Sequence, residues 1–209
     1  QKNVKNAVKD MNKNKDTLLK GIDYKILDEW CRILKKINVY IWCSKSQIYD
    51  LMKYFIENKK CNFNILCWCK DNPVPFGSSP FLSDIEYCLA FYESGIKFNQ
   101  GCENKHKYYI SHINQSDKKL YNHPTIKPIE FVKKHILNST KPNDIVLDCF
   151  CGSGTTCVAC KETGRRYIGM EINKEYYEIA KKRINGINAN GQISIFTDID
   201  KIESNQNKW

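Results

Sequence analysis

Apolar and polar positions follow two different periods along this chain. Apolar residues recur at helical spacing in several stretches, which predicts amphipathic helices at 23–36, 46–58, 128–137, 155–163 and 174–185. Short apolar runs predict strands at 39–43, 64–68, 86–92, 145–149, 167–171 and 193–196. The third of these strands would pair with the second as a hairpin. Because strands alternate with helices, the pattern indicates an α/β fold with a mostly parallel sheet, covered on both faces and carrying one antiparallel hairpin.

Breaks in these periods indicate how the chain is organised. The proline- and glycine-rich segment 71–80 predicts a loop, and 95–122 is polar with little periodicity. The Lys/Asn-rich stretch 1–16 predicts a mobile amino-terminal segment. Residues 17–200 then form one domain that is long enough for a sizeable core, and 201–209 form a tail.

The run DCFCGSGTT at 148–156 carries the clearest chemical signal. It stands between a predicted strand and a predicted helix, so it would surround a small ligand with backbone N–H groups and the carboxylate of Asp148. About twenty residues further on, Glu171 ends the next predicted strand, where a carboxylate can accept both hydroxyls of a ribose. A glycine-rich turn that only reverses the chain is disfavoured, because the loop, the preceding acid and the distant acid all occur at the spacing of a nucleoside-binding βαβ unit.

Two classes of ligand compete for such a loop. Dinucleotide sites use a third glycine and face a pyrophosphate, whereas this chain has Cys157 at that position and an acid, Asp148, just before the loop. A carboxylate repels a pyrophosphate and attracts an ammonium group. S-adenosylmethionine carries an ammonium, a sulfonium and a ribose and has no phosphate, so charge favours it over NAD.

Three motifs together resemble one family. HPTIKP at 123–128 precedes the loop at 148–156, and GRRYIGME at 164–171 follows it. This order is similar to that of the beta-type amino-methyltransferases of DNA, in which H-P-T-x-K-P precedes D-x-F-x-G-S-G-T and G-R-x-Y-I-G-x-E follows. These enzymes methylate the exocyclic amine of adenine or cytosine with S-adenosylmethionine.

The upstream half extends the resemblance. WCKDNPVP at 68–75 and DIEYCLAF at 84–91 resemble later strands of the family's catalytic half, most closely in small phage-type members. The resemblance then covers nearly all of 23–195 and implies a Rossmann-like methyltransferase fold in circularly permuted order. Its parts would be catalytic-half strands and helices at 17–92, a short target-recognition region at 93–122 and a cofactor-binding half at 123–200.

The resemblance also implies roles for individual residues. Asp148 would lie near the cofactor's amino group, Glu171 would take the ribose hydroxyls, Asn173 would approach the adenine, and Thr125 and Lys127 would contact the carboxylate. The full set expected to bind the cofactor is Thr125, Lys127, Asp148, Phe150, Gly152, Ser153, Gly154, Thr155, Glu171 and Asn173. The residues expected to bind DNA are Lys70, Asn72, Lys105, Lys107 and Tyr108.

One departure from the family pattern matters for catalysis. The family holds the flipped base with D-P-P-Y or S-P-P-Y, and neither tetrapeptide occurs in this sequence. NPVP at 72–75 is not a substitute, because it lacks the aromatic residue after the prolines and matches another family motif. No catalytic residue is therefore predicted. The first interpretation is a methyltransferase, adenine-specific rather than cytosine-specific, whose catalytic strand precedes Gln1. The alternative is an inactive remnant or subunit that binds cofactor and DNA.

Composition is compatible with this interpretation without proving it. A net charge of +10 favours polyanions such as double-stranded DNA, although frequent Lys, Asn and Ile are also typical of AT-rich genomes. Eleven cysteines include close pairs, yet Cys157 and Cys160 fall on a predicted helix, so buried thiols are favoured over a metal site or disulfides. The sequence has neither a membrane-length apolar run nor a signal-peptide pattern, which predicts a cytoplasmic protein. The resemblance also suggests two further partners, a second copy of the chain in a homodimer and a cognate restriction endonuclease.

Overall fold

The computed structural model describes residues 24–73, 80–99, 101, 105–113, 115–121 and 126–186. Contacts between residues divide the chain into two compact units. The first is residues 1–65 with 87–96, and the second is residues 66–86 with 97–209.

The first unit begins with helix α2 (Tyr24–Ile33) and strand β1 (Asn38–Cys43). Helix α3 (Lys45–Met52) follows and continues as the π-helical turn η1 (Lys53–Asn58). Ser44 and Gln47 form a capping box that starts α3, in which the Ser44 backbone N–H donates to Gln47 Oε1 at 2.8 Å. Strands β2 (Asn62–Lys70) and β3 (Ile85–Tyr92) run through both units.

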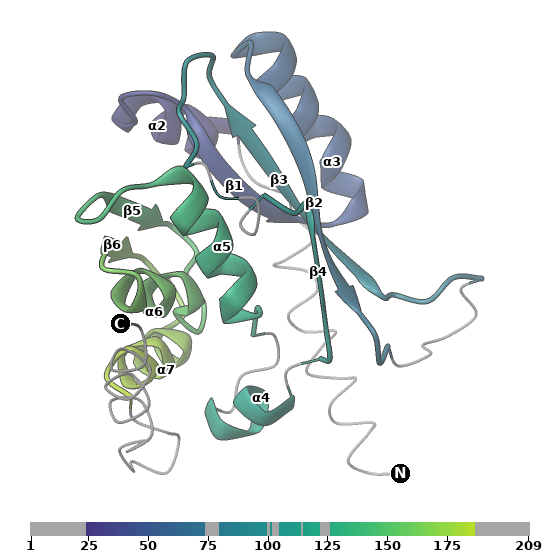
Figure 1. Ribbon diagram of the computed structural model, residues 1–209, viewed down its shortest axis with the longest axis vertical. Helices are drawn as coiled ribbons and strands as arrows, with labels where there is room; N and C mark the ends of the chain where they lie inside the picture. Colours follow the sequence, from purple (N-terminus) through teal and green to yellow (C-terminus); the bar gives the residue numbers. More distant parts are fainter. Residues whose placement is uncertain are drawn as a thin grey trace. The chain divides into compact units, whose positions relative to one another are not determined.

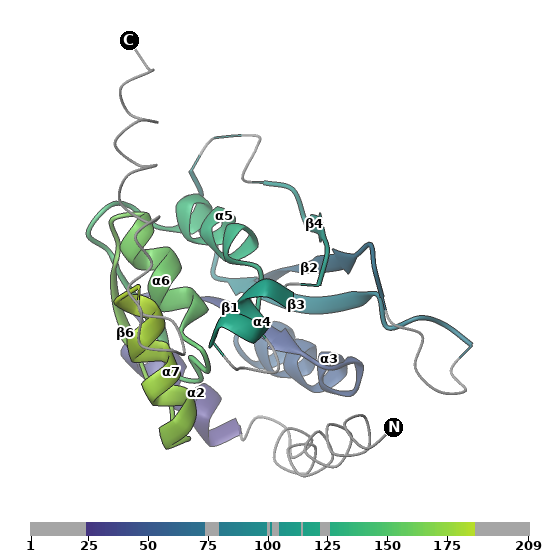
Figure 2. The same cartoon turned by 90° about the horizontal axis from the view of Figure 1, so that it is seen from below.

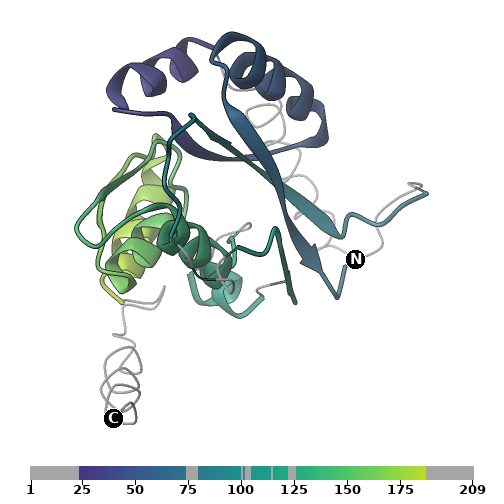
Figure 3. The same cartoon turned by 45° about the horizontal axis from the view of Figure 1, so that its top comes forward.

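The core of the first unit lies on one face of its strands. Ile41 of β1 and Leu89 and Phe91 of β3 point to the same side, because side chains alternate along a strand. Helix α2 covers this face with Leu27, and α3 with its continuation η1 covers it with Leu51 and Phe55. Figure 3 shows α2 and α3 on that side of the strands. The Phe55 and Phe91 rings stack with centroids 4.5 Å apart. The helical period predicted for 23–36 therefore marks a real buried face.

The strands form two sheets. One has four strands in the order β1-β3-β2-β4, and the other pairs β5 with β6. Strand β1 runs antiparallel to β3, with Asn38 opposite Tyr92 and Cys43 opposite Tyr87. Strands β2 and β3 are neighbours, as the hairpin prediction requires.

The second unit contains the remaining elements of the described chain. They are β4 (Tyr108–Ser111), α4 (Gln115–Tyr121), α5 (Ile129–Ser139), β5 (Ile145–Asp148), α6 (Thr155–Glu162), β6 (Arg166–Gly169) and α7 (Lys174–Ile184). Strand β2 runs parallel to β4, and β5 runs parallel to β6. Figures 1 and 2 show α5, α6 and α7 in succession beside the β5–β6 pair.

Helices α5 and α6 pack through small and branched side chains. Ile136 of α5 lies against Ala159 and Cys160 of α6. The buried Arg165 ties the far ends of the same helices together. Its Nη2 donates to the carbonyl oxygen of Thr140, the C-cap of α5, at 2.8 Å, and its Nη1 donates to the carbonyl oxygen of Thr163, the C-cap of α6, at 2.5 Å. Cys160 is a buried free thiol, as predicted. Among the described residues, no helix combines the length and the apolar composition needed to cross a bilayer.

The predicted elements differ from the observed ones in two main places, and one further prediction is not tested. β4 and α4 occupy an interval whose pattern showed little periodicity, because β4 has four residues and exposes Tyr108 and Ile110. The helix predicted for 46–58 changes to π-helical geometry at Lys53. The strand predicted for 193–196 lies outside the described residues.

His135 makes the stability of this fold depend on pH. Its side chain is 8% exposed, and burial, helped by the nearby Lys134, lowers its pKa from 6.5 to about 4. The unfolded chain therefore binds a proton between these values and the folded chain does not, so stability is full above pH 6.5 and falls as pH approaches 4. The shift corresponds to roughly 3 kcal/mol. Urea unfolding of the wild type should show the free energy of unfolding falling as pH drops through this range. His135→Leu should flatten this dependence on pH, and an unchanged dependence in the variant would contradict the assignment.

Candidate functional site

The glycine loop joins the end of β5 to the start of α6. Gly152 has φ +52° and Gly154 has φ +78°, which is left-handed backbone that favours glycine. A Cβ on Gly154 would lie 3.1 Å from the Cβ of Ala180 on α7, so a larger residue would also push that helix away. Gly154 is the N-cap of α6, and the free N–H groups of the first helical turn follow it.

Two carboxylates flank this loop from the ends of neighbouring parallel strands. Asp148 is the last residue of β5, and Glu171 follows β6 closely. Glu171 Oε2 accepts from the Gly152 N–H at 2.9 Å, and its Oε1 accepts from the Asn173 N–H at 2.9 Å. Asp148 Oδ1 accepts from the Phe150 N–H at 3.1 Å. The loop is thus hydrogen-bonded to a carboxylate at the end of each of the two strands.

The charge of Asp148 is poorly compensated. Burial raises the pKa of its carboxyl, and the nearby Glu171 adds to the shift, whereas hydrogen bonds from Thr156 and the Phe150 backbone oppose it. A cationic group placed beside Asp148 would remove this penalty. The site therefore suits a ligand that carries positive charge at this point.

The side chains of Ser153 and Thr155 face the protein interior. Both are buried, and the buried Arg183 of α7 donates from Nη1 to Thr155 Oγ1 at 2.6 Å and to Ser153 Oγ at 3.3 Å. The Arg183 guanidinium also lies 5.4 Å from the centroid of the Tyr121 ring on α4. A ligand at the loop therefore meets these two residues through their backbone.

Phe150 and Asn173 lie at the exposed edge of the loop. The Phe150 side chain is 57% exposed. Asn173 caps α7, because its Oδ1 accepts from the N–H groups of Glu175 at 2.9 Å and Tyr176 at 3.2 Å. The cap leaves the amide NH2 group of Asn173 for a ligand.

The close packing below the loop depends on one glycine of β6. A Cβ on Gly169 would lie 2.6 Å from Cys157 Sγ, a separation that side chains do not tolerate. Cys157 is buried and free, as predicted for a small hydrophobic residue. Gly169, the second glycine of the GRRYIGME motif, thus allows β6 to pack closely against α6.

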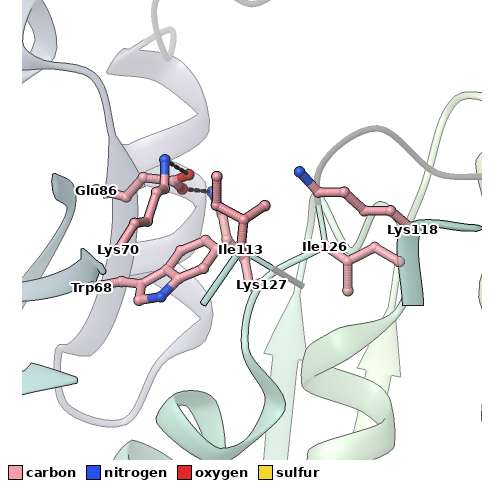
Figure 4. A pocket seen from close by; sticks show the side chains of 7 residues that line it. All are labelled: Trp68, Lys70, Glu86, Ile113, Lys118, Ile126 and Lys127. Atoms are coloured by element: carbon pink, nitrogen blue, oxygen red, sulfur yellow. Dashed lines mark hydrogen bonds and ion pairs between the residues drawn. The ribbon is translucent and has the colours of Figure 1, made fainter. Parts of the chain in front are cut away.

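Lys127 lies in a second cluster, which Figure 4 shows. Its Nζ pairs with Glu86 Oε2, and Lys70 Nζ pairs with Glu86 Oε1 at 2.8 Å. Glu86 thus joins a lysine expected at the cofactor to a lysine expected at DNA. Burial works to raise the pKa of Glu86, but Lys127 and Lys70 together bring it below its usual value. A side-chain exposure of 30% for Glu86 shows that this pairing is shielded in part from water.

The other residues expected at DNA lie near the two ends of β4. Asn72 Oδ1 accepts from the Ile113 N–H at 2.7 Å, beyond the carboxyl end of the strand. Lys105, Lys107 and Tyr108 are exposed at its amino end. The strand is about 10 Å long, so these groups could follow one nucleic-acid backbone. Thr125 lies outside the described residues.

Sequence reasoning assigned no site role to Arg183 or Glu86. Arg183 falls at the i+7 position from Tyr176 and at i+3 from Ala180, on the face of α7 that packs inward. A charged residue at a core position of an amphipathic helix was the available signal. Glu86 lies in the apolar run of β3, where a charged residue among apolar ones was the corresponding signal.

Comparison with known families decides the identity of this fold. A family model described as DNA methylase matches residues 5–182. The chain belongs to this DNA methylase family. The chain is 36% identical over 169 residues to Type II methyltransferase M2.LlaDCHI of Lactococcus lactis subsp. cremoris, a match that covers 74% of this chain and 63% of that protein. It is 32% identical over 178 residues to Type II methyltransferase M2.DpnII of Streptococcus pneumoniae, covering 77% of this chain and 66% of that one.

A solved structure supports the same conclusion. The chain resembles the M1.HpyAVI–SAM complex with a TM-score of 0.64 and 33% identity, and the match covers 78% of this chain and 83% of that one. The predicted α/β Rossmann-like methyltransferase fold is thereby confirmed. The chain spans slightly less than two thirds of the length of the two Type II relatives.

Arg183 should be important for the stability of this methylase. Arg183→Met would leave the buried oxygens of Ser153 and Thr155 without their donor, which should lower the free energy of unfolding by about 2 to 4 kcal/mol. Lys182→Met, one residue away on the exposed face of α7, is the matched control and should change it by less than about 0.5 kcal/mol. Urea unfolding measures both, and equal stability of the two variants would refute the anchoring role.

Proposed function

We propose that this methylase binds S-adenosylmethionine at the glycine loop and transfers its methyl group to the exocyclic amine of adenine, rather than cytosine, in DNA. One observation carries the proposal. Asp148 and Glu171 stand at the ends of the parallel strands β5 and β6, with a left-handed glycine loop between them. The family match supports DNA as the substrate.

The residues of the loop fit this cofactor group by group. Asp148 is a half-buried carboxylate whose pKa is raised by desolvation and by the nearby Glu171, so a cationic partner such as the ammonium group suits it. Each oxygen of Glu171 accepts one backbone N–H and retains a lone pair for a ribose hydroxyl. The first turn of α6 offers N–H groups and the positive end of its dipole to a carboxylate.

The remaining predicted contacts belong to the same proposal. Phe150, Gly152, Ser153, Gly154 and Thr155 would form the floor of the site, with Ser153 and Thr155 contributing backbone because Arg183 holds their side chains. Asn173 would reach the adenine through its amide NH2 group. Thr125 and Lys127 would add to binding of the carboxylate, with Glu86 holding the Lys127 ammonium group in place.

The work of the protein would be mainly alignment. S-adenosylmethionine supplies a methyl group that its positive sulfur already activates. The loop and the two carboxylates would fix the donor. Lys105 and Lys107, just before β4, and Lys70, at the end of β2, would hold the DNA. A target base must leave the duplex to reach the donor, which costs a few kcal/mol.

The second candidate function is an inactive subunit that binds cofactor and DNA. D-P-P-Y and S-P-P-Y do not occur in the 209 residues, so transfer by these residues themselves has to be tested. Incubation with radiolabelled cofactor and DNA, followed by nucleoside analysis, separates the two. Labelled N6-methyladenine supports the first proposal. Labelled N4-methylcytosine would show that the target base is cytosine instead of adenine. Cofactor binding without methyl transfer supports the inactive subunit. A homodimer, a cognate restriction endonuclease and a cytoplasmic location stay predictions.

Both carboxylates should be needed for cofactor affinity. Asp148→Asn and Glu171→Gln each remove a charge-assisted contact worth about 1.5 to 3 kcal/mol, so the Kd for S-adenosylmethionine should rise roughly ten- to hundredfold by calorimetry. Glu178→Gln, an exposed change of the same kind on α7, should leave the Kd unchanged. Unchanged affinity in both site variants, or tighter binding of NAD, would overturn the proposal.

Cofactor affinity should also depend on pH through Asp148. The raised pKa means that this carboxyl of the free protein takes up a proton at a higher pH than an ordinary aspartate, for which the pKa is about 3.9. Binding of an ammonium group needs the ionised form, so affinity should be full above the raised pKa and fall as pH drops through it. Asp148→Asn should remove this component from a calorimetric pH series. A wild-type series with the same shape as that of the variant would contradict the expectation.

A further inference from the structure

The cluster around Glu86 forms a pocket with surplus positive charge. Its lining comes from β2, β3, α4 and the segments that follow β4 and precede α5, and consists of Trp68, Lys70, Glu86, Ile113, Lys118, Ile126 and Lys127. Among these described residues, three ammonium groups share one carboxylate. The pocket therefore carries an excess of two positive charges.

Lys118 is the ammonium group that this arrangement compensates least. Figure 4 shows it extending from α4 toward the Glu86 pair, while Lys70 and Lys127 both contact Glu86 directly. Burial lowers the pKa of Lys118; Glu86 acts in the opposite direction, and repulsion from Lys70 and Lys127 lowers it further. A bound anion would remove this repulsion, whereas a metal cation would increase it.

The floor of the pocket is apolar and rigid. Trp68 is 2% exposed, and its Nε1 donates to Ser111 Oγ at 2.9 Å, which fixes the indole between β2 and β4. Ile126 is fully buried beside it. The Lys70 ammonium lies 5.3 Å from the centre of the Trp68 ring, so stacking and Glu86 together set its position. Charged nitrogens around an apolar floor suit an anionic oxygen group that is attached to carbon-rich neighbours.

We propose that Lys70 and Lys118 in this pocket bind a backbone phosphate of the substrate DNA, with Glu86 as the positioning residue that holds Lys70. This inference rests on the proposed function and deepens it. A phosphodiester has the required charge, and its flanking deoxyribose carbons match the half-buried side chain of Ile113. The carboxylate of the cofactor is the competing anion.

The location of the pocket favours DNA over the cofactor. Lys118 belongs to α4 and Ile113 follows β4, both within the interval 93–122 that the family pattern assigns to target recognition. No residue of the loop 148–155 lines the pocket among the residues that the structure describes. Lys127 lines it as well, so the proposed phosphate site and the proposed cofactor contact would meet at one lysine.

Lys118→Gln tests the proposal against a neighbouring control. Fluorescence anisotropy with a labelled mixed-sequence duplex, at several salt concentrations, should show a Kd about five- to tenfold higher than that of the wild type. The slope of log affinity against log salt should fall by about one, because one phosphate contact is lost. Lys119→Gln removes the same charge from the adjacent, exposed position of α4 and should leave both values near those of the wild type. Lys118→Arg should restore binding.

Calorimetry with S-adenosylmethionine distinguishes the competing anion. An unchanged cofactor Kd in Lys118→Gln, together with weaker DNA binding, supports the phosphate site. A higher cofactor Kd with unchanged DNA binding assigns the pocket to the cofactor and overturns the proposal, as does equal DNA binding by Lys118→Gln, Lys119→Gln and wild type. If the wild type binds the cofactor but no DNA, the DNA substrate of the proposed function fails as well, so the two failures are distinguishable.

Discussion

The parallel pairing of β5 with β6 is the constraint on which the candidate cofactor site depends. Parallel neighbours end at the same edge, and Asp148 therefore lies opposite Gly169, two residues before Glu171. Hydrogen bonds from Gly152 and Phe150 then attach the loop to both carboxylates. Two like charges are thus kept close together by backbone geometry, and a ligand with a positive charge lowers the energy of the arrangement.

Much of the fold could be predicted from the sequence, because its elements have strong local signals. Some elements have apolar runs or helical periods that are long or regular enough to predict directly. They are the strands β1, β3 and β5 and the helices α2, α5 and α7. The loop at 148–156 was recognisable because acid, glycines and helix occur in a fixed order. β4 escaped prediction, since a short strand with exposed Tyr108 and Ile110 leaves no clear pattern.

The side-chain partners could not be predicted, because they join residues that are distant in sequence. Glu86 meets Lys127 across 41 positions, and Arg183 meets Thr155 across 28. Composition indicated only that lysines are abundant, without showing that one carboxylate of β3 gathers two of them. The motif residues Ser153 and Thr155 likewise suggested ligand contacts, whereas their side chains serve as acceptors for Arg183.

The Arg183 anchor has a consequence for the order in which the chain acquires its structure during synthesis. The glycine loop leaves the ribosome before α7 does, and its buried oxygens await a donor from near the end of that helix. A nascent chain halted before Arg183 would contain the whole DCFCGSGTT motif yet lack the guanidinium that holds it in shape. The loop would therefore take its final shape only after Arg183, 28 positions beyond Thr155, has followed it.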